Sequence, residues 1–308
     1  MIPTDPTSSG TTECAPIALF AHRRAEHLNR LIDSLFTNEP LQRSPLFVFC
    51  DGARHEQERD AVARTRAVAH ERLGSRAQIF EYETNRGLAR SIISGVTELC
   101  QRYGRAIVFE DDLILHPGCL AFMNAALDRY ANEPRVYHVN AYRYPLPEGT
   151  APSFTRLTSS WGWGTWARAW SQFEPDATRL DQQLRERKLT RALDFQGAFP
   201  YHAMLEAQVQ GKVDSWAIRW YASVLLRGGL AISPNASQVN NRGFDNSGVH
   251  CGTTSKFDVE LGQANYDWPS EVTEDTVSLQ QMRAFFRTVN GSFPRRVARR
   301  IKRILLTN

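Results

Sequence analysis

The chain has few cysteines and no long hydrophobic run. Five cysteines occur among 308 residues, and no two of them have the C-x-x-C spacing. This pattern argues against a zinc module and a disulfide framework, and it favours a reducing cytosol. No segment reaches the roughly 18 consecutive apolar residues of a membrane-spanning helix. We therefore expect a cytoplasmic protein without a transmembrane segment.

Two nucleotide-binding signatures are also missing from the sequence. The chain contains no G-x-G-x-x-G and no G-x-x-x-x-G-K-[ST]. Their absence counts against a dinucleotide-dependent oxidoreductase and a P-loop NTPase. The net charge of +4 is too small to indicate a nucleic-acid partner.

Short apolar runs alternate with helical patterns through the first half of the chain. The runs predict strands at 16–21, 46–50, 78–82, 106–109 and 136–140. Between them, apolar periodicity predicts a helix after the first strand and further helices at 56–73, 87–103 and 117–130. This alternation predicts an α/β fold with a mostly parallel, doubly wound sheet flanked by helices.

The pattern changes after about residue 144. A proline- and glycine-rich loop is followed by four tryptophans within ten residues, and helices are expected at 184–209 and 216–226. A loop rich in glycine and asparagine follows at 235–254. No linker-like composition separates the halves, so we expect one catalytic domain made of 15–144 and 145–290. A polar leader at 1–14 is expected to be disordered, and 291–308 forms a basic tail.

Three consecutive carboxylates, Glu110, Asp111 and Asp112, come directly after the predicted strand at 106–109. The carboxyl ends of parallel strands form the ligand-binding edge of open α/β sheets. Three adjacent like charges repel one another, and a cation offsets that cost. The sequence therefore predicts a Mg²⁺ or Mn²⁺ site, because these ions prefer oxygen ligands. The alternative is a solvated acidic turn.

Each of the first four predicted strands ends in polar residues. These endings are His22-Arg23-Arg24, Asp51, Asn85-Arg86-Gly87 and the acidic triplet. Together they predict a polar pocket for an elongated ligand such as a nucleoside diphosphate, with amides at the start of the 87–103 helix facing an anion. Taken singly, each ending could equally be a helix cap.

Four motifs in order resemble bacterial glycosyltransferases of the GT-A fold, closest to the inverting group that resembles N-acetylglucosaminyltransferase I. They are N-R-G-L-A from 85, F-E-D-D-L from 109, S-W-G-W-G-T-W from 160 and N-R-G-F-D-N-S-G-V-H from 241. The resemblance spans residues 15–254. It implies a Rossmann-like GT-A domain whose first half binds a nucleotide sugar and whose second half binds the acceptor.

The resemblance also implies roles for the polar residues of the first half. Asp112 would bind the metal, and Asp111 or Glu110 would meet the ribose or hold the loop. Asp51 would contact the base or ribose, while Arg86 or Arg90 would lie near the phosphates. The triplet is E-D-D and not a plain D-x-D, so the division of labour among the three acids stays open.

In the second half, Asp214 stands before Trp216 as the family's catalytic base does, and Glu206 is the second candidate. Direct displacement with inversion needs a carboxylate that takes the proton of the attacking hydroxyl. The alternative for Asp214 is a helix N-cap, a role that Ser215 could share.

Three further residues are expected at the donor site. By the resemblance, His250 lies in a loop that closes over the donor and could touch the diphosphate or metal. Trp161 and Trp163 could stack on sugar faces. The alternative for the histidine is a structural role, and for the tryptophans core packing. We expect at least one tryptophan of this motif to serve only the core.

The segment 293–306 combines apolar residues on one helical face with six Arg or Lys residues. Such a basic amphipathic helix suits an anionic membrane surface. The alternatives are a helix packed on the domain and a contact with nucleic acid.

The sequence as a whole predicts a metal-dependent inverting glycosyltransferase. It would use a nucleotide sugar, UDP-sugar favoured, and a glycan or lipid-linked acceptor in bacterial surface polysaccharide or other glycan assembly at the inner face of the cell membrane. The alternatives are a sugar nucleotidyltransferase and a catalytically silent binding module of the same fold.

Overall fold

The computed structural model describes residues 14–147, 149, 151–245 and 254–290. Its main sheet has eight strands in the order β3-β2-β1-β4-β8-β6-β9-β7, and β10 pairs with β5 in a separate small sheet. The strands are β1 (Ile17–Ala21), β2 (Leu46–Cys50), β3 (Ala77–Glu81), β4 (Arg105–Glu110), β5 (Leu113–Leu115), β6 (Val136–Asn140), β7 (Ser153–Thr155), β8 (Trp163–Trp166), β9 (Leu230–Ser233) and β10 (Val239–Asn241).

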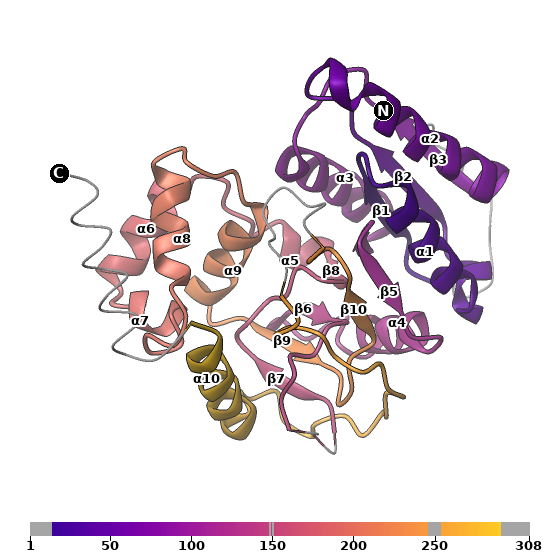
Figure 1. Cartoon of the computed structure of the whole chain (residues 1–308). Helices are drawn as coiled ribbons and strands as arrows, with labels where there is room; N and C mark the ends of the chain where they lie inside the picture. The colour runs from indigo at the N-terminus through magenta and orange to yellow at the C-terminus, as the bar shows by residue number, and fades with distance from the viewer. Residues whose placement is uncertain (1–13, 148, 150, 246–253, 291–308) are drawn as a thin grey trace.

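The α-helices alternate with strands first and then gather in the second half (Figure 1). They are α1 (Ala25–Phe36), α2 (Arg59–Leu73), α3 (Leu88–Tyr103), α4 (Cys119–Arg129), α5 (Ala167–Trp170), α6 (Ala177–Glu186), α7 (Thr190–Leu193), α8 (Tyr201–Val209), α9 (Trp216–Leu226) and α10 (Thr276–Asn290). Short 3-10 helices occupy Glu39–Arg43, Glu56–Glu58 and Gly74–Arg76. No helix within the described ranges combines the length and apolar character needed to cross a bilayer.

The first half forms the parallel part of the sheet, as the sequence predicts. Strand β1 pairs in parallel with β2 and β4, and β2 pairs in parallel with β3. The strands β1 and β2 are buried at every position, because α1 and α2 pack together on one face of this region while α3 contacts β1 and β4. The expected α/β class with a mostly parallel sheet flanked by helices is confirmed.

The second half makes the sheet mixed. Strand β8, from the tryptophan-rich motif, pairs antiparallel with both β4 and β6, so the strand predicted at 136–140 does not pair with β4. Gly164 permits this insertion: a Cβ there would lie 3.2 Å from Met123 Cε and 3.3 Å from the carbonyl oxygen of Ala106. One hydrophobic core runs from β1 through β8 to α9, and a second core cluster lies among α6, α8, α9 and α10. Because α9 contributes to both clusters, the chain is a single α/β domain.

Two predictions of secondary structure are wrong in detail. The helical region expected at 184–209 is divided among α6, α7 and α8, since Lys188, Phe195 and Gln196 adopt φ values of 57°, 49° and 58°. These left-handed conformations end a right-handed helix. The loop expected at 235–254 contains β10, whose pairing with β5 brings residue 241 beside the acidic turn.

Candidate active site

The acidic triplet lies at the end of β4, where the chain turns into β5. The carboxylates of Asp111 and Asp112 converge on one cation, the guanidinium of Arg24 at the start of α1. Arg24 Nη2 lies 3.0 Å from Asp112 Oδ2. The side chain of Asp111 is 4% exposed and that of Asp112 is 12% exposed. Asp112 is therefore the carboxylate of this pair that a ligand reaches more easily.

Negative charge at this turn exceeds the positive charge supplied by Arg24. Burial raises the pKa of Glu110 well above its usual range, and the charges of Asp112 and Asp111 raise it further. Burial also raises the pKa of Asp111, although Arg24 opposes the shift. Ionisation of these acids is thus costly with Arg24 as the only partner named here, and another cation at this turn would relieve that cost.

The segment after β10 packs directly on Asp112. The amide of Arg242 donates to the main-chain oxygen of Asp112 at 2.8 Å. A Cβ added to Gly243 would lie 2.3 Å from Asp112 Oδ2, so any side chain at this position displaces the carboxylate. His27 Nε2 on α1 lies 3.2 Å from the carbonyl oxygen of Arg242 and 3.1 Å from Asp245 Oδ2. This loop is therefore fixed between α1 and the acidic turn.

His27 and Gly243 are site residues that were not predicted from the sequence. The N-R-G motif from 241 gave a signal for the glycine, but only the pairing of β10 with β5 places it against Asp112. His250, predicted to touch the diphosphate or metal, lies outside the described residues.

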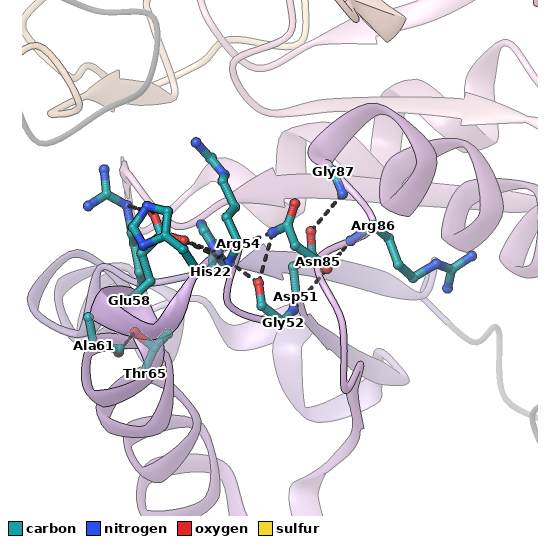
Figure 2. Close-up of polar contacts among 12 residues, drawn as sticks. His22, Asp51, Gly52, Arg54, Glu58, Ala61, Thr65, Asn85, Arg86 and Gly87 are labelled. Atoms are coloured by element: carbon teal, nitrogen blue, oxygen red, sulfur yellow. Dashed lines mark hydrogen bonds and ion pairs between the residues drawn. The ribbon is translucent and has the colours of Figure 1, made fainter.

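Asp51 holds the loop that follows β3. Its Oδ1 accepts hydrogen bonds from the amides of Gly52 (2.9 Å) and Arg86 (2.8 Å), and its Oδ2 accepts one from the amide of Gly87 (3.0 Å). Figure 2 shows the carboxylate between these amides, with the Arg86 side chain extending away from it. Asp51 is only 7% exposed, so its main contribution in this structure is to shape the 85–87 loop beside the sheet edge. That loop precedes α3.

His22 and Asn85 meet at the same carbonyl group. His22 Nε2 lies 3.0 Å from the carbonyl oxygen of Gly52, and Asn85 Nδ2 donates to that oxygen at 2.8 Å (Figure 2). Burial lowers the pKa of His22, although the nearby charge of Glu58 opposes the shift. The endings of β1, β2 and β3 are thus joined by hydrogen bonds at one edge of the sheet.

Glu58 is a buried acid that the sequence did not indicate as part of the site. Its Oε1 lies 3.3 Å from Arg23 Nε, and its Oε2 lies 3.5 Å from His22 Nε2 and accepts from the amide of Arg54 at 3.0 Å. Burial would raise the pKa of Glu58, but the Arg54 amide and the surrounding positive charges outweigh it and lower the pKa. Glu58 therefore orients two of the predicted donor-binding residues.

A cavity of about 680 Å³ brings together residues from both halves of the chain. Arg86, Arg90, Asp214 and Arg219 line it, together with the outer side of α3. The guanidinium of Arg86 lies 4.3 Å from the centre of the Tyr82 ring, a cation–π arrangement that orients this arginine. The predicted phosphate-binding arginines and the predicted base thus border one space.

Asp214 is open to solvent, with 63% of its side chain exposed, and its Oδ1 accepts a hydrogen bond from Arg219 at 2.7 Å. The N-cap alternative is assigned to its neighbour: Ser215 Oγ accepts from the amide of Ile218 at the start of α9. Glu206, the second candidate, lies on α8 and pairs with Arg185 at 2.9 Å. Among the described residues, Glu206 is not one of those that line the cavity bordered by Arg86 and Arg90.

The two tryptophans predicted to stack on sugars differ in position. Trp163 is fully buried, and its ring stacks on His138 and Trp216 with centroids 5.3 and 4.9 Å apart. It has no free face for a ligand, so core packing is its role. Trp161 is partly buried and lines a second cavity.

The acidic turn has the chemistry of a site for a hard divalent cation, because carboxylate oxygens of Asp111 and Asp112 already converge on a positive charge. Over residues 14–245 and 254–290, leaving out 148 and 150, no group of three or more His, Cys, Asp or Glu side chains is placed to hold a metal ion. Mg²⁺-type sites commonly use one or two carboxylates and complete their shell with substrate phosphates and water. The residues present fit such a site.

Three solved structures with a similar chain path, all at low similarity, are glycosyltransferases. The mannosyltransferase PcManGT from Pyrobaculum calidifontis, solved with GDP-Man and Mn²⁺, has a TM-score of 0.38 and 12% identity over 70% of each chain. GalNAc-T7 with UDP, GalNAc and Mn²⁺ has a TM-score of 0.46 and 8% identity over 75% of this chain and 44% of that one. The galactosyltransferase LgtC, solved with donor and acceptor sugar analogues, has a TM-score of 0.38 and 9% identity over 71% and 73%.

Neither a protein-family model nor a curated protein matches the chain.

Proposed function

We propose that the protein is a metal-dependent glycosyltransferase that moves a sugar from a nucleotide-sugar donor to an acceptor hydroxyl. The observation that carries the proposal lies at the carboxyl end of β4. There the carboxylates of Asp111 and Asp112 converge on one positive charge, the guanidinium of Arg24. The neighbouring strands β1 and β2 end in the hydrogen-bonded groups of His22 and Asp51. An acidic turn beside a polar sheet edge suits a metal-bound diphosphate.

The donor site is assigned to residues 15–144. Arg86 and Arg90 supply positive charge for the phosphates, and His22, Arg23 and Asn85 border the same edge. Asp51 acts mainly by holding the 85–87 loop in place beside the donor. Its second role is contact with the base or ribose of the donor. Glu110 and Asp111 support the turn, and UDP-sugar is the favoured donor class.

Asp112 would hold Mn²⁺ or Mg²⁺, with Asp111 beside it. A bound divalent cation stabilises the negative charge that develops on the leaving nucleoside diphosphate. Arg24 is already placed to balance the same carboxylates, so it either shares the site with the metal or moves aside when the donor binds.

The acceptor side is assigned to residues 145–290, with Asp214 as the base. A carboxylate that removes the proton of the attacking hydroxyl supports displacement with inversion of the anomeric carbon. The position of Asp214 on the cavity that contains Arg86 and Arg90 supports this assignment. NMR of the product anomer tests it, because retention of configuration contradicts direct displacement.

The basic tail and the family resemblance suggest the biological process in which the enzyme acts. That process is the assembly of bacterial surface polysaccharide or another glycan at the inner face of the cell membrane. The tail at 291–308 and the leader at 1–14 fall mainly outside the described residues. Deleting 293–308 should reduce co-sedimentation with anionic liposomes, and unchanged sedimentation contradicts the membrane role.

The decisive experiment measures Mn²⁺-dependent binding and slow hydrolysis of UDP-, GDP-, dTDP- and CMP-sugars. Wild type should bind at least one donor and release its nucleotide, whereas Asp112→Ala should lose metal-dependent binding and keep its fold. Asp128→Asn, at an exposed acid that pairs with Arg105, is the control. Formation of a nucleotide sugar from a nucleoside triphosphate and a sugar phosphate would favour the nucleotidyltransferase. Absence of donor binding and turnover would favour a silent module.

A further inference from the structure

A small aromatic cavity lies in the second half of the chain. Its volume is about 210 Å³, less than the roughly 300–1,000 Å³ typical of pockets for drug-sized ligands, so it has room for about one ring. The aromatic rings that line it are Tyr144, Trp161, Phe199, Tyr201, Tyr221, Phe257 and Phe286. Several of them pack edge to face: Trp161 on Phe257 at 84° and Tyr144 on Phe286 at 79°. These contacts hold the walls of the cavity in place.

One wall of this cavity reaches the acidic turn. The ring of Trp161 packs on Phe244 with centroids 5.5 Å apart. Phe244 follows Gly243, the residue without room for a side chain beside Asp112 Oδ2. A ligand against Trp161 is therefore next to the loop that borders the proposed metal site.

Another part of the cavity wall is next in sequence to the proposed base. Ser215 lines the aromatic cavity, and the preceding residue, Asp214, lines the larger cavity with Arg86 and Arg90. The peptide that joins these two residues thus lies between the two spaces. A group bound in the aromatic cavity therefore lies close to the chain segment that carries Asp214.

The hydroxyl group of Thr158 favours a sugar over a hydrocarbon chain as the molecule that fills this cavity. Thr158 lines the aromatic cavity, is 8% exposed, and its hydroxyl makes no hydrogen bond within the described part of the chain. A buried hydroxyl without a partner costs free energy. A hydrocarbon chain leaves that cost in place. The hydroxyl oxygen is closed to solvent in this structure, so a ligand hydroxyl that removes the cost reaches it after the Thr158 side chain rotates toward the cavity. Aromatic rings also suit the apolar C–H face of a pyranose.

We propose that this cavity binds one pyranose ring of the acceptor, with the ring face against Trp161 and a sugar hydroxyl on Thr158. The proposal rests on the proposed function, since it identifies the acceptor of that reaction as a glycan bound through a sugar and not through a lipid chain. Residues 158 and 161 then act in acceptor binding.

The test uses the full chain and ligand-detected NMR titrations with methyl pyranosides of glucose, galactose, mannose and N-acetylglucosamine. At least one should bind wild type. Thr158→Val should weaken that binding about fivefold, as expected for one lost hydrogen bond, and Thr158→Ser should restore it. Thr155→Val is the matched control, because Thr155 carries another buried hydroxyl without a partner in the described residues but does not line the cavity. It should change binding by less than about twofold.

A second pair of variants removes an indole ring. Trp161→Leu should abolish measurable pyranoside binding, whereas Trp268→Leu should preserve it, because Trp268 packs on Phe122 and Tyr130 away from the cavity. Farnesyl phosphate serves as the hydrocarbon probe. The proposal is overturned if no pyranoside binds wild type, if Thr158→Val and Thr155→Val behave alike, or if farnesyl phosphate occupies the cavity in place of the sugars.

The two proposals fail in different ways. Donor binding and Mn²⁺-dependent hydrolysis are measured without any pyranoside, and their absence contradicts the glycosyltransferase. Normal donor hydrolysis in wild type and in Thr158→Val, combined with unchanged pyranoside binding in that variant, contradicts only the acceptor site.

Discussion

Arg24 and Asp112 form an ion pair at the acidic turn, with Nη2 of the arginine 3.0 Å from Oδ2 of the aspartate. The same guanidinium also contacts Asp111. The protein therefore supplies one positive charge of its own to a group of three carboxylates. This pairing makes the fold less dependent on a metal, and it puts Arg24 in competition or partnership with any cation that binds there.

Removing the charge of Arg24 should make stability depend on metal. Arg24→Gln leaves two largely buried carboxylates without their partner, so we expect a loss of about 3 kcal/mol in unfolding free energy in the presence of a chelator. Added Mn²⁺ should recover more stability in the variant than in wild type. Thermal unfolding with EDTA and with Mn²⁺ measures both effects. Equal Mn²⁺ responses in the two proteins would show that the metal does not act at this turn.

A methyl group at residue 243 should disable the metal site through Asp112. In Gly243→Ala the new Cβ would lie 2.3 Å from Oδ2, so the carboxylate or the loop must shift. We expect Mn²⁺-dependent donor affinity to fall at least about tenfold, since small displacements at a site have large effects. Calorimetry with the donor measures the change. Gly118→Ala is the control, because its nearest neighbour is a side-chain atom of His116 at 3.2 Å, and near-normal affinity in Gly243→Ala would contradict the role of Asp112.

Replacing Asp51 with asparagine should disturb the 85–87 loop. The carboxylate accepts hydrogen bonds from three amides, and an asparagine must turn its NH₂ group toward at least one of them. An unsatisfied buried amide costs about 1–3 kcal/mol. We expect that loss in urea unfolding, together with weaker donor binding because Arg86 moves with its loop. A variant with unchanged stability would mean that the amides find other partners.

The charge of Asp214 should matter for transfer and not for donor binding. Asp214→Asn removes the proton acceptor and keeps the shape, so the transfer rate should fall about 10²- to 10⁴-fold while the donor binds as in wild type. Glu206→Gln is a matched control at another acid paired with an arginine, and it should retain near-normal transfer. The opposite result, with Glu206→Gln inactive and Asp214→Asn active, would assign the base to Glu206.

His138 should make the protein less stable in mild acid. It is fully buried; its Nε2 lies 3.1 Å from the carbonyl oxygen of Ser159, and its Nδ1 accepts from the indole of Trp220 at 3.1 Å. Burial lowers its pKa to about 3. Below about pH 6.5 the unfolded chain binds a proton that the folded chain does not, so stability falls by about 1.4 kcal/mol per pH unit, and no such loss occurs above pH 6.5.

The measurement compares wild type with His138→Gln by urea unfolding at pH 7 and pH 5. The stability advantage of wild type should shrink by about 2 kcal/mol between these values, because only wild type carries this titration. His55→Gln, at a histidine whose side chain is 57% exposed, is the control. Parallel pH curves for wild type and His138→Gln would contradict the buried, neutral state.

The sequence by itself determined the parallel half of the fold and the place of the acidic turn. Apolar runs predicted β1, β2 and β4 within one or two residues at each end, because a strand buried on both faces has little choice but to be apolar. Carboxylates directly after such a strand must lie at the edge of the sheet. The helix predicted at 216–226 is α9, and its predicted and observed ends coincide.

Tertiary structure decided which residues meet across the chain. The antiparallel insertion of β8 and the pairing of β10 with β5 are long-range contacts, and no local pattern encodes them. They bury Trp163 and set Gly243 against Asp112. They also leave Thr158 beside an aromatic cavity. A sequence indicates which side chains are apolar or charged, but the packing of distant segments decides which of them keep a face, an oxygen or a hydroxyl available for a ligand.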